Sequence, residues 1–332
     1  MDFSIIVPVF NAENHIEKCI YSLLNQKFNG TFEVIAVDDA STDKSLSILK
    51  EIRVKDSRIS ILQHKVNKKQ VVARATGMKA AKGNYILNVD ADDFLLPDAL
   101  ECLSKIINEF NPDVVVVDSY LEFNDGRREL KKFVDSERFT VNKISIQNSF
   151  YYHLGTKIFK RSIINNLITG KEIIITNADD ILYCFEIFLK AKSFYLLPKA
   201  FYIGCIHSNS LTRVTKPFEK LNSLSEVIRC LSLIIRKQKP EDALIYNLLK
   251  YLEMAFYDFS LLTWFSNSMN QINIEKLLIS YREFPKISDK QIRSYKLALT
   301  KNYYAFYYSL MNLGFSNTLI RILKYYCHKY II

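Results

Sequence analysis

Two short acidic runs are the residues of this 332-residue chain best suited to chemistry. The first reads Val-Asp-Asp-Ala-Ser-Thr-Asp over residues 37–43, and the second reads Val-Asp-Ala-Asp-Asp over residues 89–93. Each run follows a short segment rich in β-branched residues, so it stands where a buried strand would end. In an open parallel sheet, ligands bind beyond the carboxyl ends of the strands, and acidic residues there are candidates for a site.

Five carboxylates at two adjacent strand ends would repel one another unless a cation neutralised them. Carboxylate oxygens are the ligands that Mg²⁺ and Mn²⁺ prefer, and Mg²⁺ usually shares its site with substrate phosphates. The sequence holds neither a GxxxxGK[ST] loop nor a GxGxxG run, so phosphates are not held by a glycine loop of those types. An alternative is that an acid within 38–43 only caps the following helix, whereas the three acids within 90–93 exceed any capping need. The five residues are Asp38, Asp39, Asp90, Asp92 and Asp93.

The elements that must position these acids follow from the hydrophobic periodicity of the first 120 residues. Helical crossovers between short strands imply an α/β fold, a mostly parallel sheet with helices on both faces. Residues 121–150 are polar and predict a loop with an edge hairpin. The expected strands are Phe3–Val9, Glu33–Val37, Arg58–Gln63, Tyr85–Asp90 and Asp113–Asp118, and the expected helices are Glu13–Gln26, Asp43–Ile52, Val71–Ala81 and Pro97–Phe110.

The pattern changes along the second half of the chain. Short helices and strands return from about 151 to 215, and after Pro217 the spacing of apolar residues is helical almost throughout. We therefore expect an α/β domain over residues 1–215 and a helical region over residues 216–332.

Four segments in order, over about residues 3–100, resemble the family 2 inverting glycosyltransferases of GT-A fold, of the type that makes bacterial surface polysaccharides. They are SIIVPVFNAENHIEKCIYSLLNQ, EVIAVDDASTDKS, the set Asn67, Ala73-Arg74 and Gly77, and GNYILNVDADDFLLP. Further on, NADDILYCF (residues 177–185) resembles the family's Glu-Asp catalytic segment, and FYIGCIHSNSLTR (residues 201–213) resembles its aromatic–His–Ser–Thr segment.

The resemblance implies a role for each matching residue. Asp180 matches the catalytic base, with Asp179 in the place of the family's Glu. Asp92 matches the ligand of a metal that bridges the diphosphate, and His207 stands where some relatives have a metal or phosphate contact. Lys157 matches a common lysine to which we assign no role. Nucleotide binding is implied for Pro8, Phe10 and Asn11 at the base, Asp39 at the uracil ring N–H, Asn67 and Arg74 toward the nucleotide and phosphate, and Asp90 toward the ribose.

Four positions depart from the family pattern. Lys69 and Ala40 stand where glycine is usual or frequent, Ala75 replaces the Asn after Ala-Arg, and Cys205 replaces an Arg that often lies two residues before His207. None of these changes removes a carboxylate. They put in question the donor sugar and the contacts to phosphate.

The implied activity is that of a hexosyl- or N-acetylhexosaminyltransferase that uses a UDP-sugar and Mn²⁺ or Mg²⁺. Its acceptor would be a glycan or a lipid-linked saccharide, and residues 1–120 and 121–215 would form the nucleotide-sugar and acceptor parts. The residue types agree, because one carboxylate can serve as general base while a cation stabilises the leaving diphosphate.

Two other functions stay open. A nucleotidyltransferase shares such a sheet, but it normally carries a glycine- and lysine-rich phosphate loop, which PVFNAENH (residues 8–15) is not. A catalytically degenerate transferase acting as a binding subunit would be favoured by loss of Asp92 or Asp180, and both are present.

Composition predicts a globular protein of the cytoplasm. Hydrophobic residues make up 49% and charged residues 24%, which excludes a disordered chain. No apolar run reaches the roughly 18 residues of a membrane span, and the beginning of the chain lacks a basic segment and cleavage site typical of a secretory signal. The six cysteines are scattered without metal-ligand spacing, as in a reducing compartment.

Residues 285–332 carry much of the formal net charge of +10, with eight Lys and Arg against the single acid Asp289, and eight tyrosines. Basic residues beside aromatic ones are typical of a helix lying on an anionic membrane, so we expect peripheral attachment to the inner face of the cell membrane. The alternative is a homo-oligomer interface, which tyrosine also suits. We expect no nucleic acid partner, because the basic residues avoid the acidic runs and no RNA-binding motif occurs.

Overall fold

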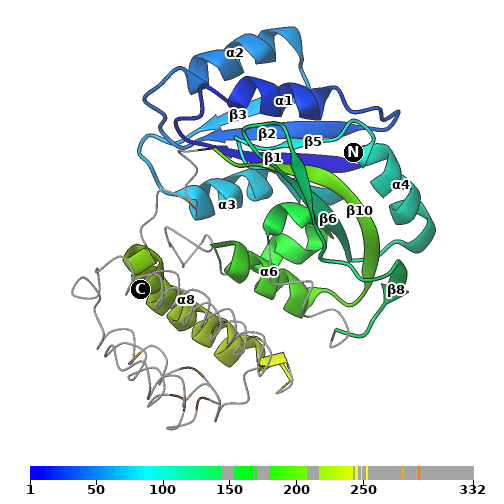
Figure 1. Ribbon diagram of the computed structural model, residues 1–332, viewed down its shortest axis with the longest axis vertical. Coiled ribbons are helices and arrows are strands. Elements are labelled where there is room, and N and C mark those ends of the chain that lie inside the picture. The colour runs from blue at the N-terminus through cyan, green and yellow to red at the C-terminus, as the bar shows by residue number, and fades with distance from the viewer. Residues whose placement is uncertain are drawn as a thin grey trace, which may run out of the picture. The chain divides into compact units, whose positions relative to one another are not determined.

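The computed structural model describes residues 1–143, 153–167, 169, 179–207 and 217–241, together with isolated positions between 244 and 291. Its contacts divide the chain into two units, Met1–Ser210 and Leu211–Ile332 (Figure 1). The first unit contains every residue for which the sequence predicts a site.

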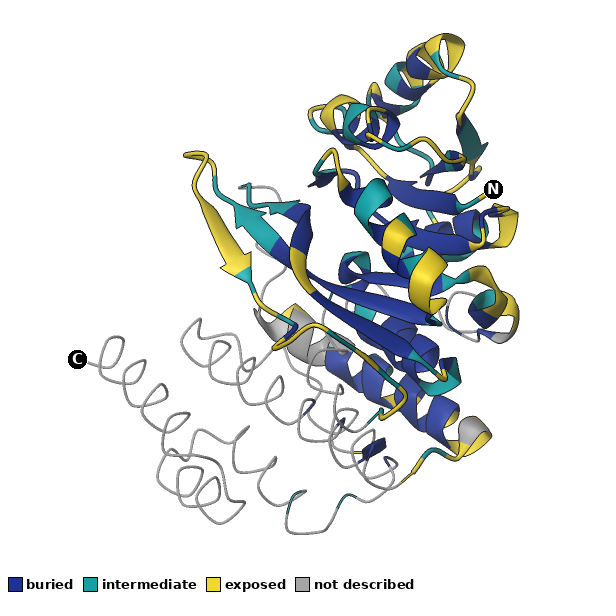
Figure 2. Ribbon diagram, turned by 90° about the vertical axis from the view of Figure 1, so that its right-hand side faces the viewer, coloured by how far each residue is buried: buried dark blue, intermediate teal, exposed yellow. Residues whose placement is uncertain are grey.

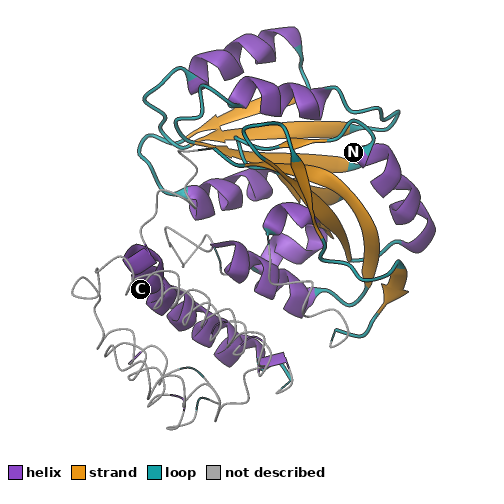
Figure 3. Ribbon diagram, in the orientation of Figure 1, coloured by secondary structure: helices purple, strands orange, loops and turns teal. Residues whose placement is uncertain are grey.

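The first unit is built on one sheet whose strands form from the β-branched runs of the sequence (Figure 3). Continuous apolar runs such as FSIIVPV are buried along their whole length, as expected for strands covered on both faces. The strands are β1 Phe3–Val9, β2 Phe32–Asp38, β3 Ile59–Gln63, β4 Tyr85–Asn88, β5 Phe94–Leu95, β6 Val114–Glu122, β7 Arg128–Lys131, β8 Arg138–Thr140, β9 Lys157–Lys160 and β10 Phe194–Cys205.

The strand order is β3-β2-β1-β4-β9-β6-β10-β5, with β7 beside β6 and β8 beside β10. The pairs β1–β2, β2–β3, β1–β4 and β6–β10 are parallel. Among the described residues, β5, β7, β8 and β9 pair antiparallel with their neighbours. The expectation of a mostly parallel central sheet is confirmed, and the expected edge hairpin is β6–β7, which turns at Gly126 with φ +81°.

Helices cover both faces of this sheet, as the sequence predicts (Figure 1). On one face, Ile16 and Leu23 of α1, Leu49 of α2 and Leu100 of α4 join the core that surrounds Ile5 of β1. On the other face lie α3 and α6. The helices of this unit are α1 Ile16–Leu24, α2 Ser45–Lys55, α3 Gln70–Ala80, α4 Ala99–Phe110 and α6 Asp179–Lys190, with short 3₁₀ turns η2 Leu154–Thr156 and η3 Arg161–Asn166.

The close packing of α3 depends on a glycine. A Cβ atom on Gly77 would lie 2.4 Å from Ile6 Cγ2 of β1, a distance that side chains do not tolerate. Gly77 therefore lets α3 approach the sheet closely, and this approach sets the position of Arg74 one turn earlier. Figure 2 shows the strands between the two helical layers as buried.

One prediction about the sheet is wrong. The two acidic runs do not end adjacent strands, because β1 lies between β2 and β4. The chain runs outward from β1 to β2 and β3, and then returns to the other side of β1 with β4. This reversal creates a switch point between β1 and β4, which is where ligands bind in open α/β sheets.

In the second unit, α8 spans Pro217–Gln238, at the start of the region for which the sequence predicts helices. Most of the remainder of that region, including nearly all of residues 285–332, lies outside the described residues. Within the part of the chain that the structure describes, no helix is both long and apolar enough to cross a membrane.

Candidate active site

Arg74 of α3 joins the acidic residues at the end of β4 to those at the start of α6. Its side chain is only 2% exposed. Nη2 donates to Asp90 Oδ1 at 2.7 Å, and Nη1 donates to Asp179 Oδ2 at 2.7 Å and to Asp180 Oδ1. Gln70, one turn before Arg74, also donates to Asp90 Oδ1, at 3.0 Å. Three carboxylates from two distant segments therefore surround one guanidinium.

The neighbouring carboxyls of Asp179 and Asp180 have pKa values shifted in opposite directions. Burial raises the pKa of Asp179 to about 6, although the Arg74 charge opposes this shift. Burial also disfavours the charged form of Asp180, but Arg74 and His153 outweigh it and lower the pKa of that carboxyl. Asp180 Oδ2 accepts a further hydrogen bond from the Leu154 N–H at 3.3 Å. Asp180 is therefore ionised over the whole range around neutral pH, whereas Asp179 takes up a proton as the pH falls through about 6. A general base must be deprotonated to accept a proton, and Asp180 meets that requirement.

Asp92 and His207, the two expected metal ligands, lie together. His207 Nε2 is 2.9 Å from Asp92 Oδ2, and the His207 ring stacks on His15 with centroids 4.4 Å apart. Burial and the charge of Asp90 raise the pKa of Asp92, so a cation here would relieve an unfavourable charge. His207 Nδ1 is buried, and no described residue forms a hydrogen bond with it. The Asp92 carboxylate is a ligand type that suits Mn²⁺ and Mg²⁺, whereas the His207 imidazole is a ligand type that suits softer divalent metals such as Zn²⁺.

Both carboxylate oxygens of Asp93 accept hydrogen bonds from other residues of the protein. Its Oδ2 accepts a hydrogen bond from the Tyr202 hydroxyl at 2.5 Å, and its Oδ1 accepts one from the Cys205 N–H at 2.7 Å. A carboxylate oxygen of Asp93, one of Asp90 and a ring nitrogen of His153 lie within 4.8 Å of one another. Both Asp93 oxygens already have partners, so this group is a poorer cation site than Asp92 with His207.

His153 is not expected at the site from the sequence; it stands directly before η2, near the carboxylates of Asp90 and Asp93. Burial lowers the pKa of its imidazole, and the ring meets that of Tyr202 edge-on at 4.6 Å. The His153 carbonyl accepts hydrogen bonds from the Thr156 hydroxyl at 2.8 Å and from Lys157 Nζ at 3.4 Å. Burial lowers the pKa of Lys157 to about 8. The lysine that the resemblance left without a role thus supports the turn that carries His153.

The residues expected at the nucleotide base lie around the ends of β1 and β2. Phe10 is 48% exposed, directly after β1, while Pro8 is buried within that strand. Asn11 Oδ1 accepts a hydrogen bond from the Thr42 N–H at 2.8 Å, which ties the end of β1 to the loop after β2. Asp39 is buried, and its Oδ1 accepts a hydrogen bond from the Lys68 N–H at 2.8 Å.

Asn67 and Arg74, expected to act together, have separate partners. Asn67 Oδ1 accepts a hydrogen bond from the N–H of Lys69 in its own loop, at 3.0 Å. No hydrogen bond between described residues joins Asn67 to Arg74. Both positions where the family has glycine keep a left-handed backbone, with φ +74° at Lys69 and φ +60° at Ala40.

The acids of the first run divide between several roles. Asp43 lies one residue before Lys44, the N-cap of α2. Its Oδ1 accepts a hydrogen bond from the Ser45 N–H in the first turn at 2.9 Å, and its Oδ2 accepts one from the Glu13 N–H at 3.0 Å. Asp43 therefore stabilises the start of the helix, as the capping alternative expects, from the position before the N-cap. Asp38 is fully buried at the end of β2, and within the described part of the chain neither of its carboxylate oxygens has a hydrogen-bond partner.

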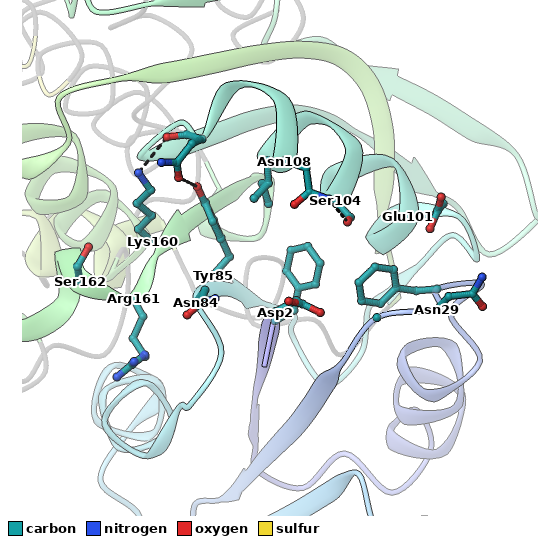
Figure 4. Close-up of a pocket in the computed structure, with 15 residues that line it drawn as sticks. Asp2, Asn29, Asn84, Tyr85, Glu101, Ser104, Asn108, Lys160, Arg161 and Ser162 are labelled. Atoms are coloured by element: carbon teal, nitrogen blue, oxygen red, sulfur yellow. Dashed lines mark hydrogen bonds between the residues drawn. The ribbon is translucent and has the colours of Figure 1, made fainter.

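A cavity of about 880 Å³ opens at the opposite end of the strands from the acidic residues, where β1 and β4 begin (Figure 4). Asp2, Tyr85 and Lys160 line it, and Lys160 Nζ donates to the Asn111 carbonyl at 2.9 Å. None of the site residues expected from the sequence lines this cavity. The strand-end acids and the cavity are therefore separate features of the molecule.

Comparisons with known proteins identify glycosyltransferases as relatives of this chain. The chain is 30% identical over 220 residues to a Bacillus subtilis protein named "uncharacterized glycosyltransferase EpsJ", covering 64% of this chain and 63% of that protein. It is 32% identical over 195 residues to a poly(ribitol-phosphate) beta-glucosyltransferase of Bacillus spizizenii, covering 58% of this chain and 30% of that one. The chain thus spans less than two thirds of the length of these relatives.

The fold is that of a solved structure, Staphylococcus aureus TarS 1-349 in complex with UDP-GlcNAc. The two superpose with a TM-score of 0.69 at 22% sequence identity, over 96% of this chain and 93% of that one. The family model described as "Glycosyl transferase family 2" matches residues 4–168, which include both acidic strand ends and Arg74. Residues 4–168 of this chain therefore form a glycosyl transferase family 2 domain.

Proposed function

We propose that the protein transfers a sugar, with inversion, from a UDP-sugar to a hydroxyl of a glycan or a lipid-linked saccharide. The observation that carries the proposal is the bridge made by Arg74, which holds the ionised Asp180 close to the strand-end Asp90. A proton acceptor and the acidic end of the nucleotide-binding sheet are thereby brought into one site.

The proposed reaction is one in-line displacement at the anomeric carbon. The acceptor oxygen forms a bond to that carbon while the bond from the carbon to the UDP oxygen breaks, and UDP leaves with the electron pair. Asp180 takes the proton of the acceptor hydroxyl as the new bond forms. The charge of Arg74 keeps Asp180 deprotonated at neutral pH, which is the state that a base requires. The described residues of the site need supply no covalent nucleophile.

Asp92 and His207 would hold a divalent cation, Mn²⁺ or Mg²⁺. When bound, such an ion supplies Lewis-acid stabilisation of the leaving diphosphate. Hydrogen bonds from Gln70 and Arg74 fix the carboxylate of Asp90, whose charge also raises the pKa of Asp92. The protein thus keeps its negative charges in fixed positions before the donor arrives, which reduces reorganisation during the reaction.

The relatives favour a role in cell-surface polysaccharide synthesis, since one of them is named for transfer to poly(ribitol phosphate). For residues 285–332 we keep both proposals, attachment to an anionic membrane and self-association. Sedimentation of the full chain with vesicles of graded anionic content at low salt separates them. Binding that rises with anionic lipid supports attachment, and sedimentation as a lipid-independent oligomer supports self-association.

A screen of sugar nucleotides tests the activity. UDP-glucose, UDP-N-acetylglucosamine and the corresponding ADP- and GDP-sugars are incubated with acceptor saccharides, with and without Mn²⁺, and nucleoside diphosphate release is measured. We expect release from a UDP-sugar that depends on both Mn²⁺ and acceptor. Release of inorganic pyrophosphate from a nucleoside triphosphate and a sugar phosphate would instead identify a nucleotidyltransferase.

A further inference from the structure

His64, in the segment after β3, is a buried histidine with a partner on each ring nitrogen. Nδ1 lies 2.6 Å from Asp39 Oδ1, and Nε2 lies 3.0 Å from the hydroxyl oxygen of Thr76 in α3. The side chains of His64 and Asp39 are 7% and 3% exposed. The imidazole is therefore a fixed bridge between the end of β2 and the helix that carries Arg74.

Thr76 determines which ring nitrogen carries a hydrogen. Its hydroxyl donates to the Val72 carbonyl, one turn earlier in α3, at 2.9 Å. Because the hydroxyl hydrogen is used there, the Thr76 oxygen accepts from His64, and Nε2 carries a hydrogen. At 2.6 Å, Nδ1 and Asp39 Oδ1 must also have a proton between them, since two lone pairs would repel at that distance. This proton lies at Oδ1 whether the ring or the carboxyl holds it.

The two oxygens of Asp39 consequently differ. Oδ1 faces His64 and also accepts the hydrogen bond from the Lys68 N–H. Oδ2 accepts no hydrogen bond from the described residues, and the Asp39 side chain as a whole is 3% exposed. With the proton held at Oδ1, Oδ2 can only accept a hydrogen bond.

We infer that His64 and Thr76 are positioning residues that make Asp39 Oδ2 an obligate acceptor, and that they thereby select a donor whose base presents a ring N–H. Uracil has such an N–H at N3, whereas cytosine has an unprotonated nitrogen at the same place. Two acceptors facing each other leave both unsatisfied, which changes binding by about 10- to 100-fold. This inference rests on the proposed function, because it takes Asp39 as the residue that meets the base.

Equilibrium binding of UDP and of CDP, each with Mn²⁺, tests the inference on the full chain. We expect the unmodified protein to bind UDP about 100-fold more tightly than CDP. His64→Phe and Thr76→Val should each reduce this ratio about tenfold, mainly by weakening UDP binding, and Thr76→Ser should restore it by returning the hydroxyl. In turnover, KM for the UDP-sugar should rise in the first two variants while kcat at saturating donor changes little.

Thr31→Val is the matched control. Thr31 is exposed just before β2, and its hydroxyl donates to Asp2 Oδ2, where β1 and β2 begin and away from the site. It also loses a hydroxyl hydrogen bond, so a ratio that falls equally in Thr31→Val would mark a general loss of stability. Thermal denaturation of each variant shows which are folded. If His64→Phe does not fold, the Thr76→Val and Thr76→Ser pair decides.

An unchanged ratio of UDP to CDP affinity in folded His64→Phe and Thr76→Val would overturn the inference and leave the proposed transfer intact. Equal affinity of the unmodified protein for UDP and CDP would overturn it as well. If the unmodified protein binds neither nucleotide and releases no diphosphate from any sugar nucleotide, the proposed function fails together with the inference.

Discussion

Arg74 Nη1 lies 2.7 Å from Oδ2 of Asp179, a residue 105 positions further along the chain. The contact joins α3, which packs on β1 and β2, to the first turn of α6. The same guanidinium reaches Asp90 at the end of β4. The buried guanidinium of Arg74 thus determines how Asp90, after β4, lies relative to Asp179 and Asp180 at the start of α6.

Arg74→Lys should lower both stability and activity although it preserves the charge. The guanidinium reaches the three carboxylates through two nitrogens, Nη1 and Nη2. The lysine side chain ends in a single nitrogen, so at least one buried acid loses its partner. Losing one partner of a buried ion pair costs about 3 to 5 kcal/mol. Urea denaturation measures this loss, and diphosphate release measures activity. The control is Arg127→Lys, because Arg127 forms an exposed ion pair with Asp125. This variant should leave the midpoint of urea denaturation unchanged. A normal midpoint for Arg74→Lys would contradict the bridging role.

Lys69→Gly should stabilise the protein. Lys69 has φ +74° and ψ +158°, a conformation that belongs almost entirely to glycine and costs about 1 to 3 kcal/mol. Glycine also loses more chain entropy on folding, by about 0.5 to 1 kcal/mol, so the expected net gain is about 1 kcal/mol. Thermal denaturation checks it. The neighbouring Lys68 is not among the residues with positive φ, and Lys68→Gly should be destabilising. A loss of stability in both variants would show that the Lys69 backbone is not strained.

The sequence predicts the strands and helices of the first 120 residues because each has its own hydrophobic period, and β1 and β2 lie within a residue of the expected bounds. It does not predict that β1 separates the two acidic runs, since the period of a strand carries no information on its neighbours. The Asp179 contact to Arg74 likewise arises only from folding. The sequence offered no signal for His64, whose partners Asp39 and Thr76 lie 25 and 12 residues away in opposite directions.

Asp92→Asn should weaken metal-dependent UDP binding strongly and leave the fold intact. Burial and the Asp90 charge raise the pKa of Asp92, so the carboxylate is held at a cost that an amide avoids. Stability without ligand should stay the same or rise. Calorimetric titration of UDP with Mn²⁺ measures binding, and exposed Asp135→Asn serves as control. If Asp92→Asn binds UDP in the presence of Mn²⁺ as tightly as the unmodified protein does, Asp92 is not the metal ligand.

Asp180→Asn should separate chemistry from binding. Without its base the enzyme should lose roughly 10²- to 10⁴-fold in kcat, while UDP and Mn²⁺ still bind. The alternative is that Asp180 serves only the start of α6. Both of its oxygens hydrogen-bond outside that helix, to Arg74 and to the Leu154 N–H, which favours the first interpretation. Single-turnover kinetics and thermal denaturation decide. A variant with reduced stability and an unchanged rate constant would assign Asp180 a structural role.

Asp179→Asn should stabilise the protein in a pH-dependent manner. Burial raises the pKa of Asp179 from 3.8 to about 6, so the folded protein holds this proton more tightly than the unfolded chain. That contribution to stability is complete below pH 3.8 and is lost as the pH rises through 6. An amide resembles the protonated carboxyl and has no such loss. The variant should therefore gain about 1 to 2 kcal/mol over the unmodified protein between pH 5 and pH 8.

Urea denaturation at pH 5 and pH 8 measures this gain. The lowered pKa of Asp180 places its titration below this range, so its ionisation does not change between the two measurements. Asp125→Asn is the control, because the hydrogen bond from the Arg127 side chain lowers the pKa of Asp125 and its titration is also complete by pH 5. Its effect on stability should be equal at both pH values. The prediction is wrong if Asp179→Asn changes the unfolding free energy equally at pH 5 and pH 8, or stabilises the protein less at pH 8 than at pH 5. Asp179 would then be ionised at both pH values and would share the charge of Arg74 with Asp180.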